Sequence, residues 1–216
     1  MSNIKLVHSG GNSVSLTTPT NNPASNVTFK LPQADGTAGQ VLQTDGNGNL
    51  TFVNPPTGIS EADQWYLNTN ITYSSSDSFL TGSIFTRVDT TFSGGTYIGS
   101  GISYNSSNGE FTFPSTGKYL ITLTGLGRPT GTDNMYMAIR QTVDNSTYRY
   151  AAKMQMHSAG PQTSSCRFLF DVTNVSTHKI KLFPWSMDNG SYWESSTGND
   201  SDGIRTNILF EKLGDT

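Results

Sequence analysis

Charged residues are scarce in this sequence. Only 13% of its 216 residues are Asp, Glu, Lys or Arg, which is about half the share of an average soluble domain. Most of the polar surface must therefore come from Ser, Thr, Asn and Gly. That composition is more typical of β-structured extracellular or virion proteins than of cytosolic enzymes. The formal net charge of −3 argues against nucleic-acid binding, because that function requires basic patches.

Cysteine and long apolar runs are also nearly absent. The single cysteine, Cys166, excludes an internal disulfide framework. It alternates with Phe168, Phe170 and Val172, so we expect a small buried side chain rather than a reactive thiol. No apolar run approaches the roughly 20 residues that span a bilayer, and the first residues lack the apolar core of a signal peptide. We therefore expect a chain made in the cytoplasm and not inserted into a membrane.

Helical periodicity is missing as well, whereas apolar and polar residues alternate with period two throughout. Clusters of Ser, Thr, Asn, Gly and Pro interrupt the alternation at short intervals, which predicts an all-β fold. We expect strands at 65–71, 80–88, 97–104, 110–113, 118–126, 135–143, 147–157, 164–172, 178–185 and 205–213. About ten strands in this span are typical of an antiparallel jelly-roll sandwich.

Residues 1–58 differ from the rest of the chain. They contain few aromatics and many turn residues, and Asp45–Asn49 reads as a glycine-rich hairpin turn. They hold too few apolar residues to bury a core of their own, so we expect them to become ordered by pairing with other chains or by docking on a larger body. The predicted organisation is an extended, β-rich attachment or shaft segment at 1–58 and a head domain at 59–216.

Patterns that carry catalysis or metal binding are not found in the sequence. His8, His157 and His178 are far apart and adjoin no Cys or carboxylate cluster, so metal-ligand spacing is missing. There is no nucleophile elbow, no phosphate-binding glycine loop and no H-E-x-x-H motif. Glu194 lies in a polar loop with two aspartates, and paired carboxylates can cleave glycosidic bonds, but a solvated loop charge is the preferred interpretation. We expect no catalytic residue, no metal and no cofactor.

The same polar loop, Ser186–Ile204, is the best candidate for ligand contact. It carries Tyr192 and Trp193, and aromatic rings in a polar loop can stack on a sugar. The polar partners would be Asp188, Asn189 and Asp200. The alternative is that both rings pack back and pin the loop. Loops of this length without structure of their own are more often functional than not.

The stretch "GEFTFPSTGKYLITLTG" carries a more specific pattern, G-x-F-x-x-P-x-x-G-x-Y. Its members are Gly109, Phe111, Pro114, Gly117 and Tyr119. The pattern resembles the signature of the complement one-q globular head within the tumour-necrosis-factor-like jelly rolls. We expect a corner here, because Pro114 cannot donate to a strand ladder and Gly117 permits backbone geometry that other residues resist. The last strand, "RTNILFEKLGDT", departs from the family's aromatic-rich ending.

The whole chain resembles tail-fibre or virion-appendage proteins of marine tailed bacteriophages. The resemblance lies in "LPQADGTAGQVLQTDGNGNLTFV", "EADQWYLNT", "FTFPSTGKYL", "FLFDVTNVSTHKIK" and "LGDT". It implies a non-enzymatic homotrimer on the virion, assembled in the host cytoplasm. Residues 1–58 would attach to another virion protein, and the head would contact a glycan or protein of the host surface. A capsid fibre or decoration protein with a purely structural role is the alternative, and a polysaccharide depolymerase ranks last.

Overall fold

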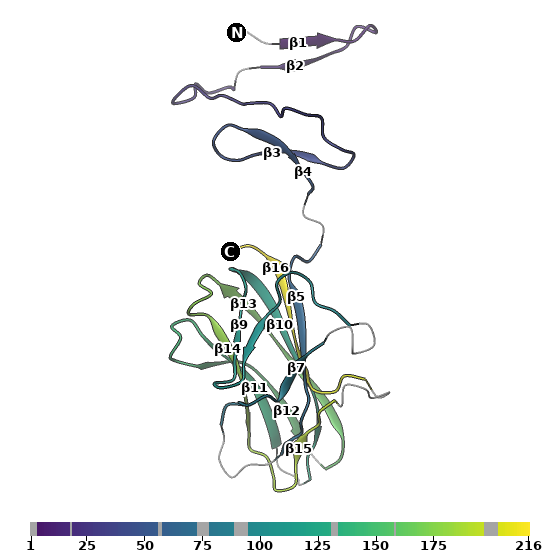
Figure 1. Cartoon of the computed structure of the whole chain (residues 1–216), viewed down its shortest axis with the longest axis vertical. Coiled ribbons are helices and arrows are strands. Elements are labelled where there is room, and N and C mark those ends of the chain that lie inside the picture. The colour runs from purple at the N-terminus through teal and green to yellow at the C-terminus, as the bar shows by residue number, and fades with distance from the viewer. Residues whose placement is uncertain are drawn as a thin grey trace. The chain divides into compact units, whose positions relative to one another are not determined.

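The structure is a computed structural model of the whole chain (Figure 1). It describes residues 4–17, 19–55, 58–72, 78–88, 95–130, 134–157, 159–196 and 203–216. These residues form two compact units, Met1–Pro56 and Thr57–Thr216, which we call the N-terminal unit and the head. Every regular element in the described ranges is a β-strand. Accordingly, no membrane-crossing helix occurs in them.

The N-terminal unit contains two antiparallel hairpins. Strand β1 (Ile4–Val7) pairs with β2 (Ser13–Leu16), and β3 (Val41–Thr44) pairs with β4 (Leu50–Val53). The turn between β3 and β4 is organised by Asp45, whose Oδ1 accepts hydrogen bonds from the backbone N–H groups of Asn47 (2.8 Å) and Asn49 (3.1 Å). The hairpin turn predicted at 45–49 is therefore confirmed.

The head is a sandwich of two antiparallel sheets (Figure 1). Its strands are β5 (Ala62–Leu67), β6 (Ile71–Thr72), β7 (Phe85–Arg87), β8 (Ser103–Asn105), β9 (Glu110–Thr112), β10 (Gly117–Arg128), β11 (Asn134–Thr142), β12 (Arg149–His157), β13 (Gln162–Val172), β14 (Lys179–Trp185), β15 (Tyr192–Trp193) and β16 (Asn207–Gly214). The seven-stranded sheet has the order β6-β15-β10-β16-β5-β7, with β13 also paired to β10, and the five-stranded sheet has the order β12-β11-β14-β9-β8. The predicted all-β jelly-roll sandwich is confirmed.

The core lies between the two sheets and follows from the period-two alternation. On β10, Tyr119, Ile121 and Leu123 are each 0% exposed, and the residues between them point to the other side of the sheet. Phe111 and Met137 of the five-stranded sheet belong to the same buried cluster. The alternating pattern thus identified the core face of the central strand correctly.

Cys166 lies on β13 and packs against this core. Burial raises the pKa of its thiol to about 11. The thiolate, the nucleophilic form of the side chain, is therefore scarce at neutral pH. This agrees with the expectation of an inert packing residue.

The signature stretch forms the predicted corner. The hydroxyl of Tyr119 donates to the carbonyl oxygen of Ser115 (3.1 Å), which closes the bend after Pro114. Gly117 has φ +147°, and a Cβ there would come within 2.7 Å of the carbonyl oxygen of Gly214 on the neighbouring strand β16. Gly109 has φ +74°, and a Cβ there would overlap the carbonyl oxygen of Leu80. The two glycines are therefore required by close backbone approach.

The strand predicted over 97–104 is wrong for most of its length, since only β8 (Ser103–Asn105) forms there. Gly99 and Gly101 both adopt positive φ. The backbone N–H groups of this stretch do not bond to a neighbouring strand. They donate instead to two buried carboxylates at the start of the head. Glu61 accepts from Ser100 (3.1 Å) and Gly101 (2.5 Å), and Asp63 accepts from Ile102 (2.6 Å).

Candidate functional site

The polar loop predicted as a contact site is partly a strand. Tyr192 and Trp193 form β15, in which Trp193 pairs with Gly127 of β10 and with Ile71 of β6. The indole of Trp193 is 0% exposed and belongs to the core. The contact role predicted for Trp193 is therefore wrong, because its ring packs inward to pin this segment on the sheet.

The other predicted contact residues are less buried. Tyr192 and Asp188 are partly buried and Asn189 is exposed, whereas Asp200 lies outside the described residues. The side-chain hydroxyl of Thr130 donates to the carbonyl oxygen of Asn189 (2.9 Å), which ties the loop to the end of β10.

Glu194 is buried rather than solvated, so the preferred interpretation of its charge is wrong. Its carboxylate lies between two guanidinium groups, with Oε2 at 2.5 Å from Arg128 Nε and Oε1 at 2.8 Å from Arg205 Nη1. The next residue, Ser195, donates its backbone N–H (2.8 Å) and its hydroxyl (2.9 Å) to Asn70 Oδ1. These bonds make Glu194 an internal ion bridge that fixes the chain after β15.

The three histidines lie in separate environments. His8 Nδ1 accepts a hydrogen bond from the backbone N–H of Gly10 (3.0 Å), and His157 is exposed at the end of β12. His178 is buried, stacks on Phe170 at 5.4 Å and bonds to two threonine hydroxyls. Across the described parts of the chain, no group of three or more His, Cys, Asp or Glu side chains could hold a metal ion.

The most unusual surface belongs to the N-terminal unit. None of its described residues is buried, and Leu50 and Val53 are partly buried. The exposed set of large apolar side chains ranges from 38% (Phe52) to 77% (Leu31) exposed. The set comprises Ile4, Leu6, Val7, Val14, Leu16, Val27, Phe29, Leu31, Val41, Leu42 and Phe52. A two-stranded hairpin is at best marginally stable in water, and scattered exposure does not account for a unit without any interior.

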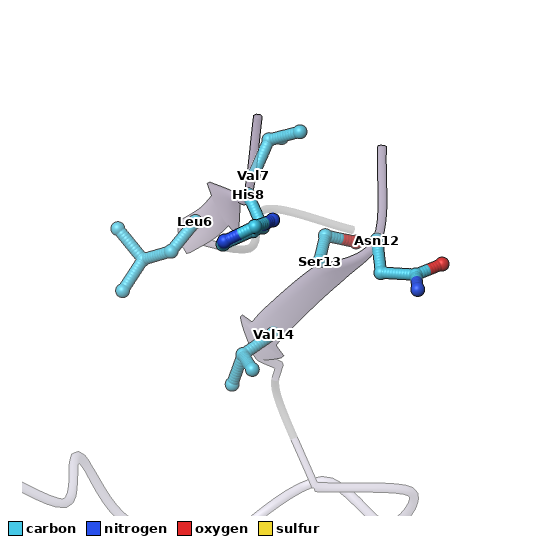
Figure 2. A pocket seen from close by; sticks show the side chains of 6 residues that line it. All are labelled: Leu6, Val7, His8, Asn12, Ser13 and Val14. Atoms are coloured by element: carbon cyan, nitrogen blue, oxygen red, sulfur yellow. The ribbon is translucent and has the colours of Figure 1, made fainter. Parts of the chain in front are cut away.

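The first hairpin shows how this surface is built. Its register pairs Ile4 with Leu16 and Leu6 with Val14, so four apolar side chains share one face. Figure 2 shows the side chains of Leu6 and Val14 projecting on one side of the hairpin and that of Val7 pointing away from them. Each of the four is 64–72% exposed. This face of the hairpin is therefore as apolar as a protein core, but no other described part of the chain covers it.

The head carries a second distinctive surface on the outer side of the five-stranded sheet. The face alternates with the core residues of β11, β12 and β14 and opposes them across the pleat. We call it the cation–aromatic face, and it consists of Tyr136, Arg140, Tyr150, Lys153, Lys181, Phe183 and Trp185. The strand register places Tyr136 beside Trp185, and Arg140 between Tyr150 and Lys181.

Aromatic rings and cationic side chains contact one another across this face. Tyr136 and Trp185 stack with centroids 4.7 Å apart and planes 9° apart. The guanidinium carbon of Arg140 lies 4.5 Å from the centroid of Tyr150 and 5.1 Å from that of Phe183. These are cation–π distances. Lys153 Nζ lies 5.9 Å from the Tyr136 ring, so positive charge and aromatic surface alternate over the sheet.

The outer side of the seven-stranded sheet has a different chemistry. Leu120, Leu126, Leu169 and Leu209 lie there, and we call this the leucine face. Leu120 pairs directly with Leu169, which is 59% exposed. The intervening positions on β10 are Thr122 and Thr124. The register also places Glu211 beside Leu120 and Arg167 beside Thr122. Leucine, threonine and charged side chains therefore share this face.

Comparison with known proteins places the fold. No family model and no curated protein matches the sequence. The structure of Eiger TNF from S. frugiperda matches with TM-score 0.52 and 10% identity, covering 72% of this chain and 93% of that chain. Murine APRIL at pH 8.5 matches with TM-score 0.50 and 12% identity, covering 71% of this chain and 98% of that chain. The head has the TNF-like jelly-roll fold.

The globular domain of zebrafish complement 1qA also matches, with TM-score 0.42 and 8% identity over 70% of this chain and 94% of that chain.

The cation–aromatic face of the TNF-like head was not predicted from the sequence. The feature of the sequence that could have predicted it is the identity of the residues that alternate with the core positions of each strand. In "MYMAIR", Met135, Met137 and Ile139 point into the core, and in "KLFPW", Leu182 does so. Apart from Ala138, the residues that alternate with them are aromatic or basic rather than Ser or Thr, which is unusual in a chain with so little charge. Alternation alone does not show which strands lie side by side, so the cluster emerges only with the register.

Proposed function

We propose that this protein is a non-enzymatic homotrimeric fibre or spike of a bacteriophage virion, assembled in the host cytoplasm. Residues 1–58 attach the trimer to another virion protein, and the head contacts the host cell surface. The observation that carries the proposal is the N-terminal unit, in which eleven large apolar side chains are 38–77% exposed and no described residue is buried.

Burial explains why this unit needs further chains. Covering an apolar side chain of the size of Leu or Val stabilises a protein by about 1.5–3 kcal/mol. The four side chains on the β1–β2 hairpin face gain little of this in a single chain, because they are 64–72% exposed. Three copies placed around an axis would bring three such faces together and form an interior between chains.

The head supports the same arrangement. Its leucine face offers leucine side chains for contact between copies, with Arg167 and Glu211 beside them. Obligate interfaces are large and resemble a core. The TNF-like fold supports self-association as the role of such a face. Three heads on one fibre would also raise the affinity for a repetitive surface through effective concentration.

Two measurements test the proposal. Analytical ultracentrifugation of the full chain should give a mass three times the 23.4 kDa of one chain. Labelling with an antibody against the head should decorate the outside of virions, and added purified protein should compete with virion adsorption to cells. A monomeric protein, or labelling without any competition for adsorption, would contradict the trimeric and the host-contact parts respectively. The second result would favour a purely structural appendage.

A further inference from the structure

We propose that the cation–aromatic face of the head binds an acidic glycan, a polysaccharide whose sugar rings carry carboxylate groups. This inference rests on the proposed function, in which the head contacts a cell surface, and it names the surface and the ligand class. The residues that carry it are Arg140, Lys153, Tyr150, Tyr136 and Trp185.

Two cations on this face have no acidic partner among the described residues. Arg87, Arg128 and Lys212 each pair with a carboxylate within 3.1 Å. By contrast, neither Arg140 nor Lys153 forms an ion pair with any residue in the described ranges. Cations left unpaired beside each other attract an anion from outside the chain.

Basic residues outnumber acidic residues on the five-stranded sheet. The strands of the five-stranded sheet carry one acidic residue, Glu110, which is occupied by Lys181 at 3.5 Å and by the hydroxyl of Tyr148 at 2.7 Å. The basic residues on the same strands are Arg140, Arg149, Lys153, Lys179 and Lys181. The chain as a whole is negative, at −3. Arg140, Lys153 and Lys181 lie on the cation–aromatic face, whereas Arg149 lies on the other side of the pleat and Lys179 is buried. The cation–aromatic face is therefore basic although the protein as a whole is acidic.

The side chain of Arg140 is held in place by contacts within the chain. Its Nη2 donates to the carbonyl oxygen of Tyr148 (2.6 Å), and the guanidinium lies over the rings of Tyr150 and Phe79. Its Nε is buried and has no hydrogen-bond partner among the described residues. A guanidinium fixed in this way loses little side-chain entropy when it binds a carboxylate.

The aromatic rings favour a sugar as the carrier of the anion. Tyr150 is 55% exposed, which leaves ring surface for the apolar face of a pyranose. Its ring lies 5.5 Å from that of Trp185, which in turn stacks on Tyr136, so the rings form a continuous strip beside the two free cations. A strip with this few cations is too weakly charged for a nucleic-acid backbone. Face-to-face pairing of two identical basic faces would bring like charges together.

The test uses the full-length protein and two probes that differ in charge only. Oligogalacturonate presents one carboxylate per ring, and its methyl ester presents the same ring without the charge. Calorimetric titration should detect binding of oligogalacturonate, weaker binding at high salt, and little binding of the ester. Such a difference would identify the carboxylate as the recognised group.

Two variants and two matched controls locate the site. Lys153→Gln should weaken oligogalacturonate binding about threefold, and Tyr150→Leu should weaken it about tenfold. Arg149→Gln removes an exposed cation from the same strand but from the other side of the pleat, where it opposes Gln141. Tyr97→Leu removes a 41% exposed Tyr that lies under Arg87, a guanidinium already paired with Asp63. Both controls should bind as the wild type does.

Three outcomes would overturn the inference: equal binding of acid and ester, binding of neither probe, or unchanged binding in both Lys153→Gln and Tyr150→Leu. Dissociation of the assembly in either variant would assign the face to an interface between copies, and this would overturn it as well. Failure of the proposed function is distinguishable, because the wild-type protein would then not compete with virions for adsorption, whatever the probes show.

Discussion

Trp193 lies directly against the backbone of Gly125. A Cβ on residue 125 would come within 2.5 Å of Trp193 Cζ3 and 2.6 Å of Met154 Cε. Because residue 125 of β10 has no side chain, the indole of Trp193 on β15 can occupy the space beside its backbone. This contact and the ion bridge of Glu194 together hold the segment after residue 190 on the sheet.

Gly125→Ala should destabilise the head, because the added methyl group meets two buried side chains in a packed core. We expect the free energy of unfolding to fall by about 1–3 kcal/mol, measured by urea titration followed through tryptophan fluorescence. Gly214→Ala is the control, since a Cβ there meets nothing within 4 Å. Equal stability of the two variants would show that the indole can move aside without cost.

Leu16→Asp should disrupt assembly of the N-terminal unit. The substitution places a carboxylate in the hairpin face that Leu16 shares with Ile4, and an unpaired charge buried between chains costs about 3 kcal/mol or more. Limited proteolysis should then cleave within residues 1–56 faster than in the wild type. Ser15→Asp adds the same charge on the opposite side of the hairpin and should leave the cleavage rate nearly unchanged. Equal sensitivity of both variants would argue against a covered apolar face.

Leu169→Glu should weaken self-association of the head. Leu169 is 59% exposed in one chain and lies beside Leu120 at the centre of the leucine face. A glutamate there would bring a further charge into the interface, on the same face as Arg167 two residues earlier. Removing that charge from water is costly, so sedimentation should show dissociation at concentrations where the wild type is associated. Val143→Glu alters a side chain of similar exposure, 54%, in the turn after β11, and it should sediment as the wild type does. Unchanged sedimentation of Leu169→Glu would exclude this face from the interface.

Asp144 should contribute stability that depends on pH. Hydrogen bonds from the backbone N–H groups of Thr147 (2.7 Å) and Ser146 (2.9 Å) hold the pKa of its carboxyl well below its usual value of 3.8. A carboxyl with a lowered pKa in the folded state stabilises it above the unfolded pKa, and this contribution is lost as the pH falls toward the folded pKa.

The variant Asp144→Asn keeps an acceptor in the turn but removes the charge. The wild type should therefore be more stable than the variant at neutral pH, and the difference should shrink below about pH 4. Urea titrations over this range would measure it. Repeating them at high salt screens distant charges and should preserve the difference. A difference that is independent of pH would show that the ionised carboxylate is not what these N–H groups stabilise.

The long strands of the head could be predicted because each has one buried side. Strand β10 was expected at 118–126 and spans Gly117–Arg128, and β14 was expected at 178–185 and spans Lys179–Trp185. The segment before β8 could not be predicted, because its N–H groups bond to Glu61 and Asp63, side chains about 40 residues earlier. The alternation of apolar and polar residues gives no information about hydrogen bonds to side chains this far away in the sequence.

The site was harder to predict than the fold. Trp193 in its polar surroundings looked like a loop residue, since the two-residue strand β15 is too short to show any alternation. The cation–aromatic face depends on three strands meeting in register, with a bulge between Ile139 and Arg140 that brings Tyr150 beside Arg140. A one-residue change in that register would place Tyr150 on the core side. The sequence contains the residues but not their pairing.

The absence of an interior in the N-terminal unit has a consequence for the order of assembly. If its stabilisation comes from contacts between chains, this unit cannot fold in a newly made monomer. The head has a core of its own and can fold first. Once heads associate, the attached segments are held at high effective concentration, and their hairpins then fold in a process that no longer depends on bulk concentration. We therefore expect association of the heads to align the N-terminal segments of the different chains. The N-terminal unit, although it is synthesised first, would then fold after the head.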